Sequence, residues 1–255
     1  MTDGTTRPLA GKVAIVTGAG KNIGRAIACN LAADGAALVV NGRHDQGAVG
    51  AVVDEIAAAG GSAVGHMADV SEPEAVAGLA AAAVEAFGGI DIAVSNAGLR
   101  RQTPMLEMSY AEWREILSVA LDGAFLLAQA VAPSMIDRGG GAFVGLSGMS
   151  HHLGLANRCH VSASKAGLEG LVRSLAVELA PHRITVNAVS PGSIDTVRGA
   201  SAGALPPGGG GADAPLGRQG TVEEIAAAVA YLVGPGGAYV TGQTIHVNGG
   251  RFFGK

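Results

Sequence analysis

A lysine, a serine and several histidines lie close together in the middle of the sequence and could carry acid–base chemistry. Residues 159–167, CHVSASKAG, predict a helix that contains Lys165. Residues four apart share a helix face, so the neighbour of Lys165 on that face is Val161, which can neither donate nor accept a proton. Imidazoles titrate near neutrality and hydroxyls donate hydrogen bonds. The candidate catalytic residues are Lys165, Ser147, His151, His152 and His160.

A glycine-rich stretch, TGAGKNIG at residues 17–24, lies between an apolar strand and a helix. Backbone N–H groups at such a helix start point toward an anion, and the helix dipole favours negative charge there. Asn22 stands where glycine is more usual, and asparagine tolerates positive φ. We predict a turn that binds the pyrophosphate of a dinucleotide through Gly18, Lys21, Asn22, Ile23 and Gly24.

The end of the second predicted strand, NGRHD, bears on which dinucleotide is bound. A carboxylate at this position would bind the ribose hydroxyls of NAD. The sequence instead has Arg43, with Asp45 two residues later, and Lys21 lies in the glycine-rich turn. Two cations around an adenosine site suit the 2′-phosphate of NADP. We therefore predict NADP as the cofactor, with NAD as the alternative.

Short apolar runs alternate with long alanine-rich helical stretches along the chain. The predicted strands are residues 12–18, 37–42, 62–70, 90–98, 141–147, 184–192 and 242–250. Strands that are apolar throughout and alternate with helices indicate a parallel sheet covered on both faces. Right-handed crossovers then give an α/β, doubly wound Rossmann fold.

The chain shows no sign of a second domain. Residues 1–10 are expected to form a flexible N-terminus, and residues 11–255 a single Rossmann-type domain. One Gly/Pro-rich segment, at about 196–220, cannot hold a regular element over its middle. It is either a disordered surface loop or a lid over a pocket at the carboxyl ends of the strands.

Charge and composition exclude several classes of partner. The net charge is −4 and the pI about 6.0, which gives no electrostatic reason to expect nucleic acid or an anionic membrane. No run approaches a membrane span of about 18 apolar residues, and the N-terminus does not resemble a signal peptide, so we expect a cytoplasmic protein. Cys29 and Cys159 are too few and too far apart for a disulfide framework or a Cys-based zinc site, and no metal is expected.

Taken together, the motifs resemble the short-chain dehydrogenase/reductase family, and within it the 3-oxoacyl-carrier-protein reductase-like branch. The likeness runs from Gly11 to Gly250 and is carried by TGAGKNIG, DV at 69–70, NAG at 96–98, SASKAG, SPGSIDT at 190–196 and VTGQTIHVNGG at 240–250. It implies a seven-stranded sheet with helices on both faces, in a homotetramer or homodimer. The cofactor-binding residues it implies are Asp69, Val70, Asn96, Ala97, Gly98, Lys165, Pro191, Gly192, Ile194 and Thr196.

The sequence departs from the family at the residues that normally move the proton. The family's tyrosine, serine and asparagine positions correspond to Val161, Gly148 and Ala120, while Ser147 lies one residue before the serine position. Of the four residues of the relay, only Lys165 remains. A positioned general acid is typically worth about 10²–10⁴ in rate, so these departures affect the reaction, whereas cofactor binding depends mainly on other residues.

Three functions are compatible with this pattern. The first is an NADP-dependent oxidoreductase acting on a small-molecule ketone or alcohol through a non-standard proton relay. The second is a catalytically silent subunit in a hetero-oligomer with an active relative. The third is a non-redox enzyme, such as an isomerase, lyase or cyclase, that reuses the pocket. Arg100 and Arg101 follow the fourth strand, where they either hold an acidic or phosphopantetheine-bearing substrate or are solvated at a loop or subunit edge.

Overall fold

The apolar runs form one seven-stranded parallel sheet in the computed structural model, which describes residues 7–197 and 211–254. The strands are β1 (Val13–Val16), β2 (Ala37–Gly42), β3 (Ser62–Met67), β4 (Ile92–Ser95), β5 (Gly141–Leu146), β6 (Ile184–Pro191) and β7 (Thr244–Val247). They lie in the order β3-β2-β1-β4-β5-β6-β7, and each neighbouring pair is parallel. The predicted doubly wound Rossmann sheet is confirmed.

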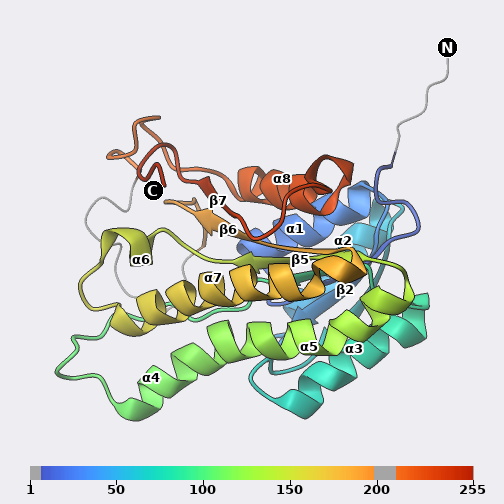
Figure 1. Cartoon of the computed structure of the whole chain (residues 1–255), viewed down its shortest axis with the longest axis horizontal. Coiled ribbons are helices and arrows are strands. Elements are labelled where there is room, and N and C mark those ends of the chain that lie inside the picture. Colours follow the sequence, from blue (N-terminus) through green and yellow to red (C-terminus); the bar gives the residue numbers. More distant parts are fainter. Residues whose placement is uncertain (1–6, 198–210, 255) are drawn as a thin grey trace.

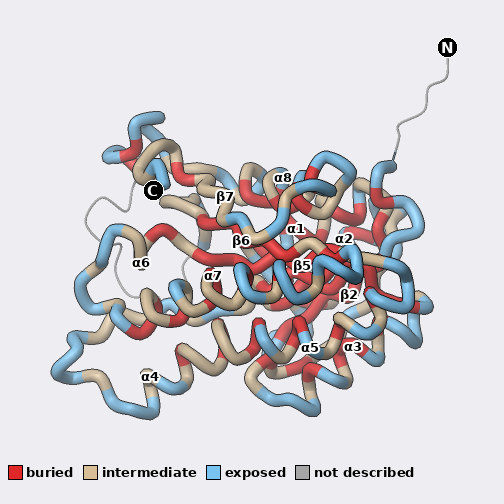
Figure 2. Tube along the Cα trace, viewed as in Figure 1, coloured by how far each residue is buried: buried red, intermediate tan, exposed pale blue. Residues whose placement is uncertain are grey.

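Helices cover both faces of the sheet (Figure 1). One face packs against α1 (Asn22–Ala33), α2 (Gln46–Ala58) and α8 (Val222–Val233). The other packs against α3 (Pro73–Phe87), α5 (Gly123–Asp137) and α7 (Cys159–Leu179). The shorter elements are α4 (Tyr110–Leu117), η1 (Ser118–Asp122), α6 (Ser150–Leu153), η2 (Ala180–His182) and η4 (Pro235–Gly237). Burial is greatest along the central strands between the two layers (Figure 2).

The strand order reverses between β1 and β4, and this positions the site. Crossovers that leave these two strands run in opposite directions along the sheet, so a crevice opens at the carboxyl ends of the strands. The turn after β1 and the loops after β4, β5 and β6 all lie at this edge of the sheet.

The helix that connects β4 and β5 is continuous from Tyr110 to Asp137, with a π-helical segment at η1. Its most apolar 18-residue window has a mean hydropathy of 1.7, so by length and composition it could cross a membrane. This corrects the expectation that no run approaches membrane length. Leu127, Val131 and Met135 on this helix are nonetheless buried in the core against the sheet, which is the packing of a core helix.

Two predicted segments fall partly outside the described residues. Residues 1–6 of the expected flexible N-terminus and residues 198–210 of the Gly/Pro-rich segment are not described. The boundary predicted at residue 10 is wrong, because Leu9 is buried and its N–H donates a hydrogen bond to the Asp34 carbonyl at 2.9 Å. Residues 7–10 therefore pack onto the domain.

Candidate active site

The glycine-rich turn between β1 and α1 is built from backbone conformations that need small side chains. Gly18 has φ of 61°, and a Cβ there would lie 3.0 Å from Ala97 Cα. A Cβ on Gly24 would lie 2.4 Å from the Gly18 carbonyl oxygen. Asn22 adopts φ of 51°, which confirms that asparagine takes the positive-φ position of the turn. The turn therefore keeps the close approach of backbone that a pyrophosphate requires.

Two asparagines from the strands on either side of β1 hold this turn in place. Asn96, just after β4, donates from Nδ2 to the carbonyls of Thr17 and Gly18 at 2.9 and 3.0 Å. The Gly18 N–H donates to Asn41 Oδ1 at 3.3 Å. Asn41 is buried in β2 and had not been singled out from the sequence. Its role depends on strands that pair only in the folded sheet, so no local pattern marks it.

A cavity of about 340 Å³ opens over the turn and the ends of β2 and β4. Its lining includes Gly18, Lys21, Asn22, Ile23, Gly24, Arg43, Asp69, Val70, Asn96, Ala97, Gly98 and Thr196. Arg43 Nε lies 2.9 Å from Asp69 Oδ2. Burial raises the pKa of Asp69, but hydrogen bonds from Ser71 and the charge of Arg43 outweigh it, and the pKa is lowered. Glycines that allow close approach to the backbone, with cationic side chains beside them, suit the phosphates of a dinucleotide.

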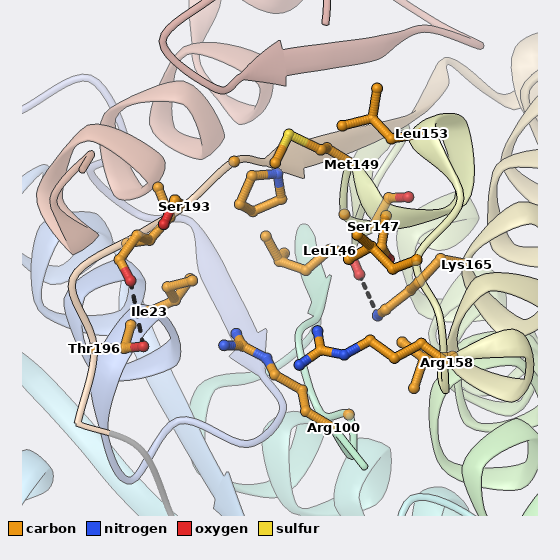
Figure 3. A pocket seen from close by; sticks show the side chains of 18 of the residues that line it. Ile23, Arg100, Leu146, Ser147, Met149, Leu153, Arg158, Lys165, Ser193 and Thr196 are labelled. Carbon is orange, nitrogen blue, oxygen red and sulfur yellow. Dashed lines mark hydrogen bonds between the residues drawn. The ribbon is translucent and has the colours of Figure 1, made fainter. Parts of the chain in front are cut away.

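A second cavity, of about 300 Å³, adjoins the first, since Ile23, Asn96, Gly98, Arg100 and Thr196 are among the residues that line both. Its lining also includes Ser147, Gly148, Met149, Ser150, Leu153, Arg158, Val161, Lys165, Pro191, Gly192 and Ile194. Figure 3 shows the side chains of this cavity from close by. The residues expected to hold the two ends of a dinucleotide therefore line one groove.

Lys165 extends from α7 into this second cavity. Its ammonium donates a hydrogen bond to the Leu146 carbonyl at 2.5 Å (Figure 3). Burial, together with the charge of Arg100, lowers the pKa of Lys165 to about 8. An amine with such a pKa exchanges a proton readily near neutral pH.

The positions that depart from the family lie around Lys165. Val161 and Gly148 both line the cavity, and a Cβ on Gly148 would meet no atom within 4 Å. Ala120 is buried within η1 and is not among the lining residues. The cavity thus keeps room for a side chain at Gly148, and Val161 presents an apolar side chain to it.

The Ser147 hydroxyl donates to Glu169 Oε1 at 2.7 Å, in a cluster that the sequence did not predict. The Nε2 atoms of His151 and His152, from α6, lie 3.2 and 3.4 Å from the same oxygen. Burial raises the pKa of Glu169, but contact with His151 and the hydrogen bond from Ser147 prevail and lower it to about 2. Neither histidine is among the described residues that line the cavity. Glu169 was missed because its neighbours come from other elements.

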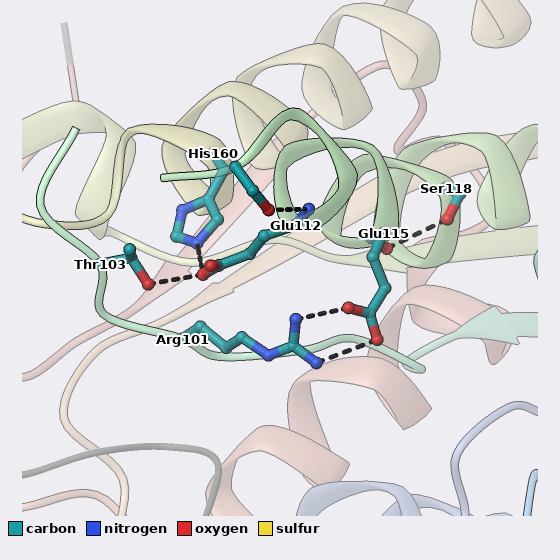
Figure 4. A network of polar contacts seen from close by, with 7 residues as sticks. Arg101, Thr103, Glu112, Glu115, Ser118 and His160 are labelled. Carbon is teal, nitrogen blue, oxygen red and sulfur yellow. Dashed lines mark hydrogen bonds and ion pairs between the residues drawn. The ribbon is translucent and has the colours of Figure 1, made fainter. Parts of the chain in front are cut away.

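His160 lies in a different network, shown in Figure 4. It is buried, and its Nε2 lies 3.3 Å from Glu112 Oε1, which also accepts a hydrogen bond from Thr103 at 2.5 Å. Arg101 pairs with Glu115, one NH donating at 3.0 Å. Neither His160 nor Arg101 is among the described residues that line the second cavity. This fits the sequence geometry for His160, which lies about 140° around the helix from Lys165.

Two arginines extend into the cavity beside Lys165 (Figure 3). Arg100 follows β4, as the sequence suggested, and Arg158 is the N-cap of α7. Arg158 was missed because it is distant from Arg100 in sequence, and only the fold brings them to one cavity. The cavity wall thus brings Arg100 and Arg158 together with Lys165, and Arg251 also lines it.

The two ends of the Gly/Pro-rich segment border the groove. Asn22 Nδ2 donates to the Val197 carbonyl at 3.0 Å, and the Val197 N–H donates to Asn22 Oδ1 at 3.0 Å. At the other end, the Gly220 carbonyl accepts from the Asp195 N–H at 2.9 Å. Both ends are therefore held beside the groove, and residues 198–210, the part of the segment expected to be either a surface loop or a lid, lie outside the described residues.

Comparisons with known proteins agree with this arrangement. The family model described as Enoyl-(Acyl carrier protein) reductase matches residues 18–251. The 3-oxoacyl-[acyl-carrier-protein] reductase FabG of Escherichia coli (strain K12) is 39% identical over 248 residues, covering 95% of this chain and 98% of that protein.

Solved structures of dehydrogenases and reductases are similar to this chain in both fold and sequence. A short-chain type dehydrogenase/reductase from Mycobacterium marinum is 39% identical, with a TM-score of 0.88, covering 96% of this chain and 97% of that one. A 7α-hydroxysteroid dehydrogenase complexed with NADH and 7-oxo glycochenodeoxycholic acid is 32% identical, with a TM-score of 0.87 and 98% of both chains covered. The chain belongs to the short-chain dehydrogenase/reductase family.

Proposed function

We propose that the chain is an NADP(H)-dependent oxidoreductase that interconverts a ketone and an alcohol, with Lys165 as the proton donor. The observation that carries this proposal is the position of Lys165. Its amine, with a pKa lowered to about 8, lies in a cavity that adjoins the glycine-rich cradle. Bound NADP(H) would supply or accept the hydride at its nicotinamide ring.

The glycine-rich turn supports the dinucleotide, and two cations support the choice of NADP. Lys21 and Arg43 both line the adenosine side of the groove. A carboxylate that would bind the ribose hydroxyls of NAD is not at the end of β2, because Asn41 and Arg43 occupy this region. At the other end, Pro191, Gly192, Ile194 and Thr196 line the cavity where the nicotinamide would lie.

The proton step falls to Lys165 because the side chains at and beside the family's relay positions cannot perform it. Val161 and Gly148 have no acidic or basic group that could transfer a proton, and the Ser147 hydroxyl already donates its hydrogen bond to Glu169. In the direction of reduction, the Lys165 ammonium gives its proton to the carbonyl oxygen as the alkoxide forms. His151, His152 and His160 stay as predicted donors to be tested alongside it.

Arg100 and Arg158 favour a substrate that carries a carboxylate or phosphate. Both line the cavity, and Arg100 is near enough to lower the pKa of Lys165. Guanidinium groups bind such anions through paired hydrogen bonds. A keto acid or a phosphorylated ketone meets this chemistry.

Purified protein tests these assignments directly. Calorimetry with NADPH and NADH measures nucleotide binding, and a panel of keto acids and their methyl esters measures turnover. We expect NADPH to bind more tightly, keto acids to react faster than their esters, and Lys165→Met to lose turnover while keeping NADPH binding. Arg158→Gln should reduce the preference for the acid, whereas Arg101→Gln, outside the cavity, should not. If nucleotide binds and the wild type reduces no compound in the panel, the oxidoreductase proposal fails.

The empty relay positions favour a second candidate, a catalytically silent subunit. Val161, Gly148 and Ala120 together remove three of the four side chains of the family's relay. Co-purification with an active relative from the native cell would support this role, and activity of a pure homo-oligomer would exclude it. A product formed without net NADPH consumption would instead support a non-redox enzyme.

We also propose a cytoplasmic homo-oligomer, as a tetramer or dimer. Exposed apolar side chains on separate elements support association, among them Phe125 on α5, Val177 on α7 and Tyr239 after α8. Sedimentation of the purified protein measures the assembly, and a monomer at micromolar concentration would contradict it.

A further inference from the structure

We propose that His151, His152 and Glu169 form a binding site for a divalent transition-metal ion of the zinc type. No metal was expected from the sequence, because the two cysteines are too far apart for a zinc motif. The proposal goes beyond the oxidoreductase function and does not depend on it.

The three side chains come from two elements that the fold brings together. His151 and His152 lie on α6, and Glu169 lies on α7. One ligand atom from each residue lies within 4.8 Å of the others. The side chains of His151 and Glu169 are 7% and 6% exposed, so the donors are shielded from bulk water. Two imidazoles and a carboxylate are a ligand set that zinc accepts.

The distances fit a shared ion better than a pair of hydrogen bonds. The two Nε2 atoms lie 3.2 and 3.4 Å from Glu169 Oε1, yet neither has a hydrogen-bond partner among the described residues. A tetrahedral ion with bonds of about 2.0–2.1 Å would hold its ligand atoms roughly 3.3–3.4 Å apart. The nitrogens would then point at the ion between the ligands.

Other buried polar atoms gather on the sheet face beside this cluster. The Ser147 N–H donates to the Val189 carbonyl and thus extends the β5–β6 register by one residue, which puts Ser147 opposite Ser190. Ser190 is in turn opposite His246 in the register of β6 and β7. Residues in register on adjacent strands direct their side chains to the same face. Ser190 Oγ and His246 Nδ1 are also buried without a hydrogen-bond partner among the described residues. Such atoms are rare in proteins and indicate water or an ion.

Neighbouring contacts would hold the ligands in position. The Ser147 hydroxyl donates to Glu169 Oε1, and the ring of His152 stacks on Phe252 with centroids 4.4 Å apart and planes 13° apart. Outer contacts of this kind orient metal ligands. Ser150 and Leu153 on α6 line the substrate cavity, so an ion at this site would fix one wall of the cavity to α7.

Cobalt tests the site, because Co²⁺ has visible absorption bands that report its coordination and zinc has none. The experiment uses the full chain without a histidine tag, stripped with chelator and titrated with CoCl₂. We expect about one equivalent bound, with the intense bands of a four- or five-coordinate site, and displacement by one equivalent of ZnCl₂.

Matched variants separate this site from surface binding. Glu169→Gln and His151→Asn should lose affinity by more than the roughly 10–100-fold typical of outer-contact changes, while His182→Asn, at an exposed histidine, should bind like the wild type. Zinc should raise the Tm of the wild type and of His182→Asn, but not of Glu169→Gln, which circular dichroism can check for folding. The proposal is overturned if the wild type shows no such cobalt bands, or if Glu169→Gln binds as tightly as His182→Asn.

Discussion

The two ends of the groove differ in how they are built. At the adenosine end, the turn at residues 17–24 keeps its glycines, and Asn41 and Asn96 hold it by hydrogen bonds. At the substrate end, Val161 and Gly148 leave Lys165 without a neighbouring hydroxyl on its helix face. The structure of the adenosine end depends mainly on backbone conformation, whereas the chemistry of the substrate end depends on its side chains. Nucleotide binding and catalysis should therefore respond separately to mutation.

Rebuilding the relay should have the largest effect. Val161→Tyr combined with Gly148→Ser places a phenol one turn before Lys165 and a hydroxyl where a Cβ meets no atom within 4 Å. We expect kcat for ketone reduction to rise by about 10²–10⁴ because a positioned general acid is restored. Steady-state kinetics measures this, with the single variants as controls. An unchanged kcat at unchanged NADPH affinity would show that Lys165 already supplies the proton efficiently.

A methyl group in the turn should have the next largest effect, at the other end of the groove. Gly24→Ala places a Cβ 2.4 Å from the Gly18 carbonyl oxygen, so the turn must shift and NADPH affinity should fall by about tenfold or more. Gly50→Ala is the matched control, because its Cβ meets no atom within 4 Å in helix α2. Calorimetry compares the two, and equal affinities would contradict the assigned cradle.

The pH dependence of reduction should follow Lys165. With a pKa of about 8, the amine is protonated below that pH and loses its proton above it. Reduction needs the proton, so kcat/KM should fall about tenfold per pH unit above 8, whereas alcohol oxidation, which needs the free amine, should rise up to about pH 8 and level off above it. Initial rates from pH 6 to about 10 measure both. If Lys165→Arg, whose side chain stays charged, retains the same descent, another group titrates.

The smallest expected effect is on the preference for NADPH over NADH when a cation near the adenosine is removed. Lys21→Ala removes an exposed cation from the adenosine cavity, and exposed ion pairs are worth up to about 1 kcal/mol, so NADPH affinity should fall roughly two- to fivefold while NADH affinity stays unchanged. Arg25→Ala is the control, since Arg25 pairs with Glu55 and does not line the described cavity. Equal losses for both nucleotides would argue against a 2′-phosphate contact.

Sequence reasoning succeeded where neighbours along the chain decide the structure. The glycine-rich turn was predicted because Gly18, Asn22 and Gly24 act through their own backbone angles and nearby atoms. Lys165 and Val161 were placed together by helical spacing alone, and both line the cavity. Sequence reasoning was less successful for charged side chains. Arg101, which it named, pairs with Glu115 outside the cavity, whereas Arg158, which it did not name, lines the cavity.

The order of residues along the chain was enough to predict the parallel, doubly wound sheet and the position of the glycine-rich turn. Alternating apolar strands and helices have few other ways to bury their surfaces, and glycine angles are local. The tertiary structure alone decided that Glu169 meets His151, His152 and Ser147, and that Arg100 meets Arg158. These contacts join side chains from separate elements, and their geometry follows from how α6, α7 and the strand ends pack against one another.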